Sequence, residues 1–325
     1  MEIKAAIVKS VFIRVLKQVG LKILKHKIFH SKLLLFGEHI INKGAMGLAI
    51  PLERYDGVFQ KGDMKYPEAK HSNHQLELLA NYIIYSEDLK NQYDTNTFLE
   101  DVERGLYFDS NIPQGYGLGS SAALVAAVYD RYYLYKKKNY VISEVKHHLA
   151  QLESYYHGKS SGLDAIVSFM NKAVIINQGE VVEAFVLPKD QSGKMKLFLI
   201  NTHLERKTAP YVNLFLEKCK DSRFMSNLQM SLIPSNNMAI TSFLQKKYSE
   251  LWKSIKIISQ VQLDILPEFI PENFKDIWRS GLQSDQFALK ICGAGGGGFI
   301  IGFAPEHANL PLLLRGADYM EVLTF

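Results

Sequence analysis

The segment 113–123, with the sequence PQGYGLGSSAA, constrains the fold of this chain more than any other stretch. Gly115, Gly117 and Gly119 occupy alternate positions, and a run of helix-forming residues follows from Ala122. Glycine adopts backbone angles that a Cβ forbids, and it lets the main chain approach a ligand closely. A helix that begins here presents unpaired N–H groups and the positive end of its dipole. The segment therefore favours a phosphate-binding loop over a flexible turn before a buried helix.

Two well-known phosphate-binding loops do not fit this segment. No Gly-Lys-Ser/Thr follows the glycines, which excludes a Walker A loop. Ser120 stands where a dinucleotide-binding fingerprint needs a further spaced glycine. The hydroxyls of Ser120 and Ser121 can instead cap the helix or reach a metal ion.

Composition limits the class of protein. A chain of 325 residues is long enough for two domains with sizeable cores. Cys219 and Cys292 lie far apart, so we expect neither a disulfide framework nor a zinc site, and a reducing cytoplasm fits. No apolar run approaches the roughly 20 residues of a membrane span. The spacing of His39, His157 and His203 does not indicate a metal site.

The positive charge is concentrated at the N-terminus. Residues 1–27 carry seven Lys or Arg side chains against Glu2, while the whole chain has a net charge of +5. We treat 1–27 as a basic extension, or as the product of a start site placed too far upstream, and not as a secretory signal. A basic amphipathic helix can lie on an anionic membrane, but we do not expect that here. Without a basic surface elsewhere, we expect no nucleic-acid binding.

Hydrophobic spacing predicts an α+β fold, because strands and helices mix without regular βαβ alternation. Predicted strands cover 31–39, 45–52, 106–110, 174–176, 181–186 and 195–201, and a last pair covers 299–303 and 319–323. Predicted helices cover 74–86, 120–136 and 142–156, and helices dominate 209–283. Residues 54–70 are expected to form a polar loop. A soft domain boundary is expected near 188–193, where polar residues, Pro and Gly cluster.

Three further patterns carry candidate chemistry. Segment 32–39, KLLLFGEH, places Lys32 at the edge of a strand that ends in a glycine turn; the alternative is a solvated strand start. Glu153 lies late in a helix and Asp164 follows a small-residue turn; either could be only a helix-end charge or cap. The glycines of 293–298 cost folding entropy, so they indicate close packing or a ligand unless the loop is merely flexible.

Segments 32–39, 113–123 and 290–299 resemble, in this order, the three motifs of the GHMP kinases, which are named for galactose, homoserine, mevalonate and phosphomevalonate kinases. Segment 113–123 matches the fixed positions of their P-x-G-x-G-L-G-S-S-A-A motif. Segment 153–164 resembles the E-x3-H-G-x-P-S-G-x-D pattern of mevalonate kinases, with Ser160 in place of Pro. Galactokinases have G-x-M-D-Q instead, which is absent here. Segment 290–299 resembles the third motif, K-x-T/S-G-A-G-G-G-G-x, with Cys292 in place of the usual Thr or Ser.

The resemblance implies two domains after the extension. Residues 28–190 would form an ATP-binding and catalytic domain like domain 2 of ribosomal protein S5. Residues 191–325 would form a ferredoxin-like α+β domain, with ATP bound between the two.

The resemblance also implies the roles of individual residues. Asp164 would accept the proton of the attacking hydroxyl, and Lys32 would pair with Asp164. Ser121 and Glu153 would hold Mg²⁺, with Ser120 as the alternative to Ser121. The nucleotide would contact Pro113, Gly115, Gly117, Leu118, Gly119, Ser120, Ser121, Gly293, Gly295 and Gly296. The acceptor would contact Glu38, His39 and Thr208, with Arg206 nearby.

The function implied is that of a cytoplasmic, ATP- and Mg²⁺-dependent kinase that phosphorylates the terminal hydroxyl of mevalonate in isoprenoid precursor synthesis. The partners would be ATP and a small alcohol, and a homodimer is left open. Two alternatives remain at this point. One is a GHMP kinase for phosphomevalonate or a sugar, and the other is a nucleotide-binding sensor of the same fold that has lost catalysis.

Overall fold

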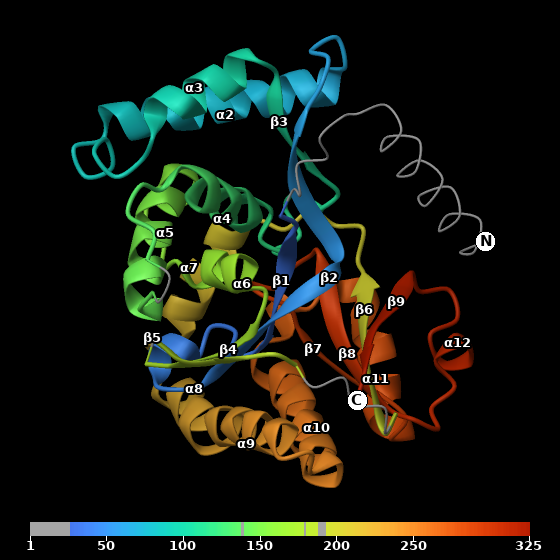
Figure 1. The fold of residues 1–325 in the computed structure, drawn as a ribbon. Coiled ribbons are helices and arrows are strands. Elements are labelled where there is room, and N and C mark those ends of the chain that lie inside the picture. The colour runs from blue at the N-terminus through green and yellow to red at the C-terminus, as the bar shows by residue number, and fades with distance from the viewer. Residues whose placement is uncertain (1–26, 138–139, 179, 188–192) are drawn as a thin grey trace.

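The computed structural model describes residues 27–137, 140–178, 180–187 and 193–325. Two sheets organise this part of the chain (Figure 1). A five-stranded sheet has the order β1-β2-β4-β5, with β3 paired to β2, and a four-stranded sheet has the order β7-β8-β6-β9. The strand pairs in both sheets are antiparallel. This mixture of sheets and helices confirms the α+β class.

The first sheet and its helices come from the N-terminal half of the chain. The strands are β1 Phe29–Phe36, β2 Gly47–Lys61, β3 Leu106–Ser110, β4 Ala173–Asn177 and β5 Glu180–Phe185. The helices are α2 Pro67–Tyr85, α3 Thr95–Glu103, α4 Ser120–Tyr132, α5 Ile142–His157 and α6 Leu163–Met170. Most residues of α4 are buried, and many of these have small or β-branched side chains. The helix packs against α5, α6 and β1. Helices α2 and α3 lie beside β3 (Figure 1) and contact this group through Tyr82 of α2, whose ring lies against Tyr155 of α5, and Phe98 of α3, which stacks on Tyr132 of α4.

The second sheet is covered by the C-terminal helices. Its strands are β6 Met195–Asn201, β7 Ala288–Ile291, β8 Phe299–Pro305 and β9 Tyr319–Thr324. The helices are α7 Thr208–Lys218, α8 Ser222–Asn227, α9 Ile233–Leu244, α10 Tyr248–Ile265, α11 Lys275–Ser284 and α12 Leu310–Leu313. Helices α10 and α11 pack on β7, where Trp278 is fully buried and donates a hydrogen bond of 3.2 Å to the Ser259 carbonyl.

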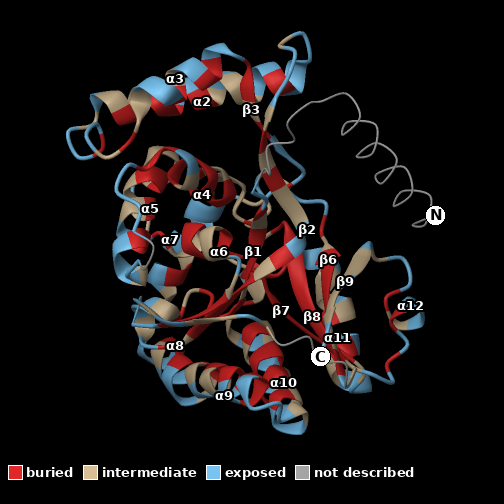
Figure 2. Ribbon diagram, in the orientation of Figure 1, coloured by how far each residue is buried: buried red, intermediate tan, exposed pale blue. Residues whose placement is uncertain are grey.

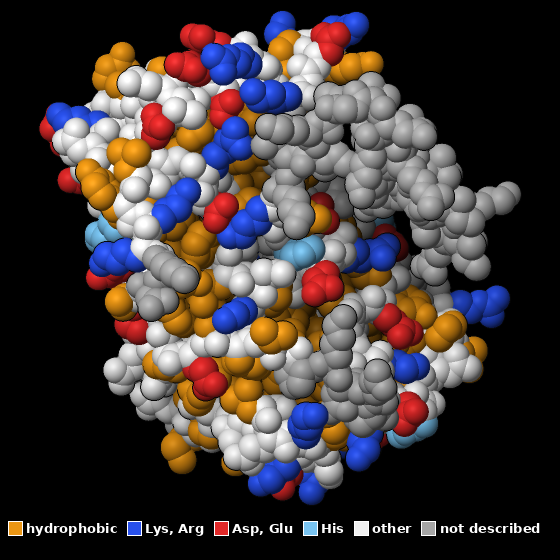
Figure 3. Space-filling model, viewed as in Figure 1, with side chains coloured by type: hydrophobic (Ala, Val, Ile, Leu, Met, Phe, Trp, Pro, Cys, Tyr) orange, Lys and Arg blue, Asp and Glu red, His pale blue; other side chains and the backbone are white. Residues whose placement is uncertain are grey.

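The two sheets share one hydrophobic core. Figure 2 shows the buried residues concentrated in the strands of both sheets and on the inner sides of the helices. Polar contacts also cross between the halves, because Asn236 and Asn237 of α9 bond the backbone of Met46 at 2.8 and 2.9 Å. On the face drawn in Figure 3, acidic and basic side chains are interspersed. Within the described ranges, no helix is long and apolar enough to cross a membrane.

Several predicted elements differ from the structure. The loop expected over 54–70 is wrong for 54–61, which extend β2 because residues 57–61 pair with β3. It is also wrong for 67–70, because α2 begins at Pro67 and not at 74. Strands β8 and β9 do not pair with each other, since β6 lies between them. The helix from Ser120 ends at Tyr132 and not at 136. The next residue, Tyr133, pairs with Tyr93 in an isolated β-bridge.

Other predictions lie partly outside the described residues. The extension is described only from Lys27, whose ammonium lies 2.7 Å from Asp130. The boundary between 190 and 191 also falls outside, in the segment between β5 and β6. The division into domains at that point stays a prediction.

Candidate active site

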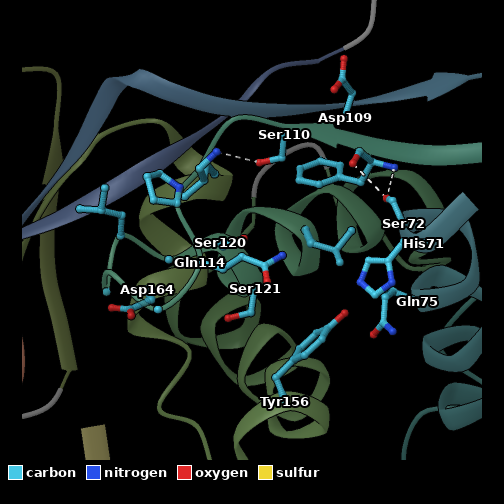
Figure 4. Close-up of a pocket in the computed structure, with 18 of the residues that line it drawn as sticks. His71, Ser72, Gln75, Asp109, Ser110, Gln114, Ser120, Ser121, Tyr156 and Asp164 are labelled. Carbon is cyan, nitrogen blue, oxygen red and sulfur yellow. Dashed lines mark hydrogen bonds between the residues drawn. The ribbon is translucent and has the colours of Figure 1, made fainter. Parts of the chain in front are cut away.

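A cavity of about 730 Å³ lies between α2 and β3 on one side and the loop before α4 on the other. This volume is within the range of small-molecule sites in proteins. Figure 4 shows Asp164 at one end and His71 and Gln75 at the other, with Gln114 and Ser121 between them. The lining residues from the loop and α4 are Pro113, Gln114, Gly115, Gly117, Leu118, Gly119, Ser120, Ser121 and Leu124.

The glycine loop leaves the start of α4 open to the cavity. Gly115, Gly117 and Gly119 have φ angles of 77°, 73° and 77°, a left-handed conformation that favours glycine. Gly119 is the residue before the helix, and it has no side chain with which to cap the first amides of α4. Because Ser120 and Ser121 line the cavity, these amides and the helix dipole lie at its wall. The loop can therefore bind an anion through backbone N–H groups.

Lys32 and Asp164 meet at the edge of this cavity. The Lys32 ammonium lies 2.8 Å from Asp164 Oδ2, and the two side chains are 8% and 46% exposed. Lys32 comes from β1, and its backbone N–H bonds the Leu118 carbonyl at 2.9 Å. A Cβ at Gly119 would lie 3.0 Å from Lys32 Cγ, so this glycine makes room for the lysine. The ion pair expected from the sequence is present, and it places a carboxylate beside the glycine loop.

Glu153 is a buried carboxylate on α5, beside Asp164. Burial, and then the negative charge of Asp164, raise the pKa of Glu153 to about 7. The Ser160 hydroxyl donates a hydrogen bond to its Oε2. A buried carboxylate with a raised pKa is stabilised in its charged form by a nearby cation.

The residues present fit Mg²⁺ in the chemistry of their oxygens. Glu153 offers a carboxylate and Ser121 a hydroxyl, both hard oxygen donors. Within the described ranges, no group of three or more His, Cys, Asp or Glu could hold a metal alone. Mg²⁺ commonly binds through one or two protein ligands, waters and substrate phosphates, so a sparse donor set is consistent with it.

The third glycine segment, 293–298, packs on other parts of the chain and does not line the cavity. A Cβ at Gly293 would lie 2.0 Å from Arg206 Nη1, and one at Gly296 would lie 1.9 Å from the Tyr211 ring. Gly296 N–H also bonds the Phe269 carbonyl at 2.7 Å. The segment is therefore a closely packed loop. The predicted nucleotide contacts at Gly293, Gly295 and Gly296 remain untested, since none of the three lines the cavity.

Arg206 lies between the glycine loop that precedes α4 and the glycine segment 293–298. A Cβ at Gly117 would lie 2.1 Å from its Nη1, so glycine is required on that side as well. Within the described residues, its Nε and Nη1 atoms are buried and have no hydrogen-bond partner. Arg206 and Thr208 both line the cavity, and their place near the substrate stays a prediction. Buried guanidinium nitrogens without an acceptor are costly, so the Nε and Nη1 atoms of the half-buried Arg206 point to an anionic ligand.

Glu38 and His39 occupy a different position from Thr208, outside the cavity lining. The Glu38 carboxylate lies 2.5 Å from the Lys290 ammonium, and the two side chains are 2% and 1% exposed. His39 stacks on Phe215 at 4.8 Å, and its Nε2 bonds the Ala294 carbonyl at 3.1 Å. Burial lowers the pKa of His39. The assignment of both residues to the acceptor pocket stays a prediction.

Sequence reasoning missed the cavity wall formed by α2 and β3. Glu68, His71, Ser72 and Gln75 of α2 line it, together with residues 107–110 of β3. The Ser72 hydroxyl accepts from Phe108 N–H at 2.9 Å and donates to the Phe108 carbonyl at 3.0 Å, which fixes the helix to the strand. The spacing i, i+3, i+4, i+7 of these polar residues is a signal for one helix face.

The comparison with protein families matches the part of the chain that contains the glycine loop. Residues 82–172 match the family model described as the GHMP kinases N terminal domain. The matched segment contains the glycine loop, Glu153 and Asp164. This part of the chain is therefore similar to the N-terminal domain of the GHMP kinases, in agreement with the resemblance of its sequence motifs. No curated protein matches the chain in sequence.

Solved structures show the same fold over nearly the whole chain. The mevalonate kinase of Methanococcus jannaschii superposes with a TM-score of 0.61 at 18% identity, over 93% of this chain and 99% of that one. The galactokinase of Lactococcus lactis gives 0.63 at 14% identity, over 98% of each chain. The phosphomevalonate kinase of Streptococcus pneumoniae gives 0.62 at 12% identity, over 91% and 99%. The chain thus has the fold of the GHMP kinases, a family of small-molecule kinases.

Proposed function

We propose that this protein is an ATP- and Mg²⁺-dependent kinase that transfers the γ-phosphoryl group of ATP to the terminal hydroxyl of mevalonate. One observation carries the proposal. The Lys32–Asp164 ion pair, 2.8 Å long, lies at the edge of a cavity whose wall is the glycine loop. A base beside a phosphate-binding loop is the arrangement that phosphoryl transfer to an alcohol needs.

The nucleotide phosphates are held by the glycine loop in this proposal. The left-handed glycines turn the loop backbone around the phosphates, and the start of α4 supplies N–H donors and a positive dipole end. The cavity continues to α2 and β3, which leaves room for the nucleoside at the end lined by His71 and Gln75.

Asp164 acts on the acceptor. Its carboxylate accepts the proton of the hydroxyl as the oxygen attacks the γ-phosphorus. Lys32 holds this carboxylate in place and lies close enough to stabilise negative charge in the transition state. Phosphoryl transfer depends mainly on such positioning and charge stabilisation.

Ser121 and Glu153 would hold Mg²⁺, with Ser120 as the alternative hydroxyl. When bound, the ion supplies charge neutralisation on the phosphates. Glu153 is suited to this role because its carboxylate is buried beside the Lys32–Asp164 pair, and Lys32 is already engaged by Asp164.

Two observations support mevalonate as the acceptor. The string from Glu153 to Asp164 resembles the pattern of mevalonate kinases, with Ser160 as the departure. Arg206 lines the same cavity, and its buried Nε and Nη1 atoms have no hydrogen-bond partner among the described residues, which favours an anionic reactant. Mevalonate carries a carboxylate, whereas galactose carries no charge.

An acceptor panel tests the proposal. The purified full chain is incubated with ATP and Mg²⁺, and ADP release is measured with mevalonate, phosphomevalonate or galactose. The mass of each product is recorded, so that ATP hydrolysis is not counted as transfer. The expected result is the highest kcat/KM for mevalonate. A higher value for another acceptor would reassign the substrate, and nucleotide binding without transfer to any acceptor would contradict a kinase.

A further inference from the structure

The turn between α5 and α6 is organised by a residue that departs from the family pattern. Ser160 stands where that pattern has a proline. Its hydroxyl donates to Glu153 Oε2 and accepts from Gly162 N–H at 3.0 Å. Its own N–H donates to the Ser154 hydroxyl at 3.3 Å. One side chain thus connects α5, the turn and the start of α6.

A proline at this position could form none of these bonds. It has no N–H to donate to Ser154 and no hydroxyl to bind Glu153. The serine is therefore not a neutral replacement. It adds a hydrogen-bond donor directly to the buried Glu153 carboxylate, which is close enough to Lys32 and Asp164 to feel their charges.

The position of this turn affects both carboxylates of the site, Glu153 and Asp164. Gly162, with a φ angle of 72°, begins α6, and a Cβ there would lie 2.3 Å from the Lys146 carbonyl of α5. The start of α6 therefore lies directly on the backbone of α5. Asp164 is two residues further on, in the first turn of α6. A shift of the turn would move Asp164 relative to Glu153.

We propose that Ser160 is a positioning residue that orients the Glu153 carboxylate toward the catalytic cation. The hydrogen bond engages Oε2, which fixes the rotation of the carboxylate and presents Oε1 as the ligand. The hydrogen bond from Gly162 N–H holds the Ser160 hydroxyl, and with it the Glu153 carboxylate, in a fixed position relative to Asp164. The inference rests on the proposed function, in which Glu153 is a ligand of Mg²⁺.

Metal affinity tests this inference without relying on turnover. Mn²⁺ replaces Mg²⁺ as a spectroscopic probe, and its binding to the full chain is measured by electron paramagnetic resonance with a non-hydrolysable ATP analogue present. Loss of a partner that orients a metal ligand typically costs about 10–100-fold in affinity or activity. We expect Ser160→Ala to weaken Mn²⁺ binding about tenfold, and Ser160→Thr to restore it because the hydroxyl is kept.

The matched control is Ser161→Ala. Ser161 is the exposed neighbour in the same turn, and its hydroxyl accepts only a long bond of 3.4 Å from Leu163 N–H. This variant should bind Mn²⁺ as the unmodified protein does. Thermal unfolding of each variant shows whether the turn still folds, and a purely structural role for Ser160 would lower the melting temperature without changing Mn²⁺ affinity.

The outcomes separate this inference from the proposed function. Glu153→Gln should weaken Mn²⁺ binding at least as much as Ser160→Ala. If Glu153→Gln has no effect on Mn²⁺ binding, Glu153 is not a ligand and the inference falls with it. If Glu153→Gln weakens binding but Ser160→Ala does not, the role of Ser160 alone is overturned. An equal loss in Ser161→Ala would also overturn it.

Discussion

Asp164 is held at the cavity edge by an ammonium group that is itself almost fully buried. Asp164→Asn keeps the shape of the side chain but removes its ability to accept a proton. We expect turnover to fall by about 10²–10⁴-fold, the usual contribution of a general base, while the nucleotide still binds. Steady-state ADP release measures the first quantity and titration calorimetry with an ATP analogue measures the second. Near-normal turnover would remove Asp164 from the role of base.

The buried Glu153 predicts how the stability of the metal-free protein depends on pH. Its folded-state pKa of about 7 lies above the usual value of 4.5, so the folded state binds the proton more tightly than the unfolded state. Lowering the pH from 8 to 5 should therefore raise the free energy of unfolding by roughly 1–3 kcal/mol from this group. Urea unfolding at both pH values measures the change.

Glu153→Gln is the control for that pH dependence. The amide does not titrate, so the variant should lose this part of the pH dependence and be more stable than the unmodified protein at pH 8. The same pH dependence in both proteins would show that the Glu153 carboxylate is not the group responsible.

At the scale of elements, the conformation of the glycine loop depends on the residues that it contacts as well as on the backbone freedom of its glycines. Gly117 and Gly44 both have positive φ angles, 73° and 89°. A Cβ at Gly117 would collide with Arg206, whereas one at Gly44 would meet nothing within 4 Å. Both Gly→Ala variants should lose stability, because alanine is strained in this conformation. Gly117→Ala should also displace Arg206 from the site.

This difference gives a matched pair of variants. A displacement of about 1 Å in a site can lower the rate about 100-fold, so we expect kcat/KM for ATP to fall at least about tenfold in Gly117→Ala. Gly44→Ala, in the turn between β1 and β2, should keep kcat/KM close to that of the unmodified protein. Equal values in the two variants would show that the contact with Arg206 is not needed for activity.

The local motifs were predictable because their signals are short in sequence. The helix after the loop begins at Ser120 and β3 covers Leu106–Ser110, as glycine spacing and apolar patterns predict. Residues 54–61 were missed because their strand character comes from pairing with β3, and nothing in their own pattern shows it. The bond from Ser160 to Glu153 was also invisible, since it depends on how a turn folds back on a helix.

At the scale of the whole molecule, Lys290 and Glu38 join the two halves. The pair is buried, 2.5 Å long, and links the turn after β1 to β7 across 252 residues of sequence. Removing one member of a buried pair leaves an uncompensated charge and costs about 3–5 kcal/mol. Lys290→Met should therefore lower the free energy of unfolding by that amount, as measured by urea denaturation.

A double variant controls for this effect. Lys290→Met combined with Glu38→Leu removes both charges and should recover most of the stability, because an apolar pair can replace a buried ion pair. A single variant as stable as the unmodified protein would show that the pair does not hold the halves together. No sequence pattern predicts this contact, because its partners meet only when both sheets are assembled.

The most direct test of the account is to follow the phosphoryl group itself. Phosphorus NMR of the full chain with ATP, Mg²⁺ and mevalonate should show the loss of the γ-phosphate signal and equal gains of ADP and a phosphomonoester. Asp164→Asn should show neither gain on the same time scale. Release of inorganic phosphate alone, or an unchanged ATP spectrum in the presence of bound nucleotide, would contradict phosphoryl transfer to mevalonate at the Lys32–Asp164 site.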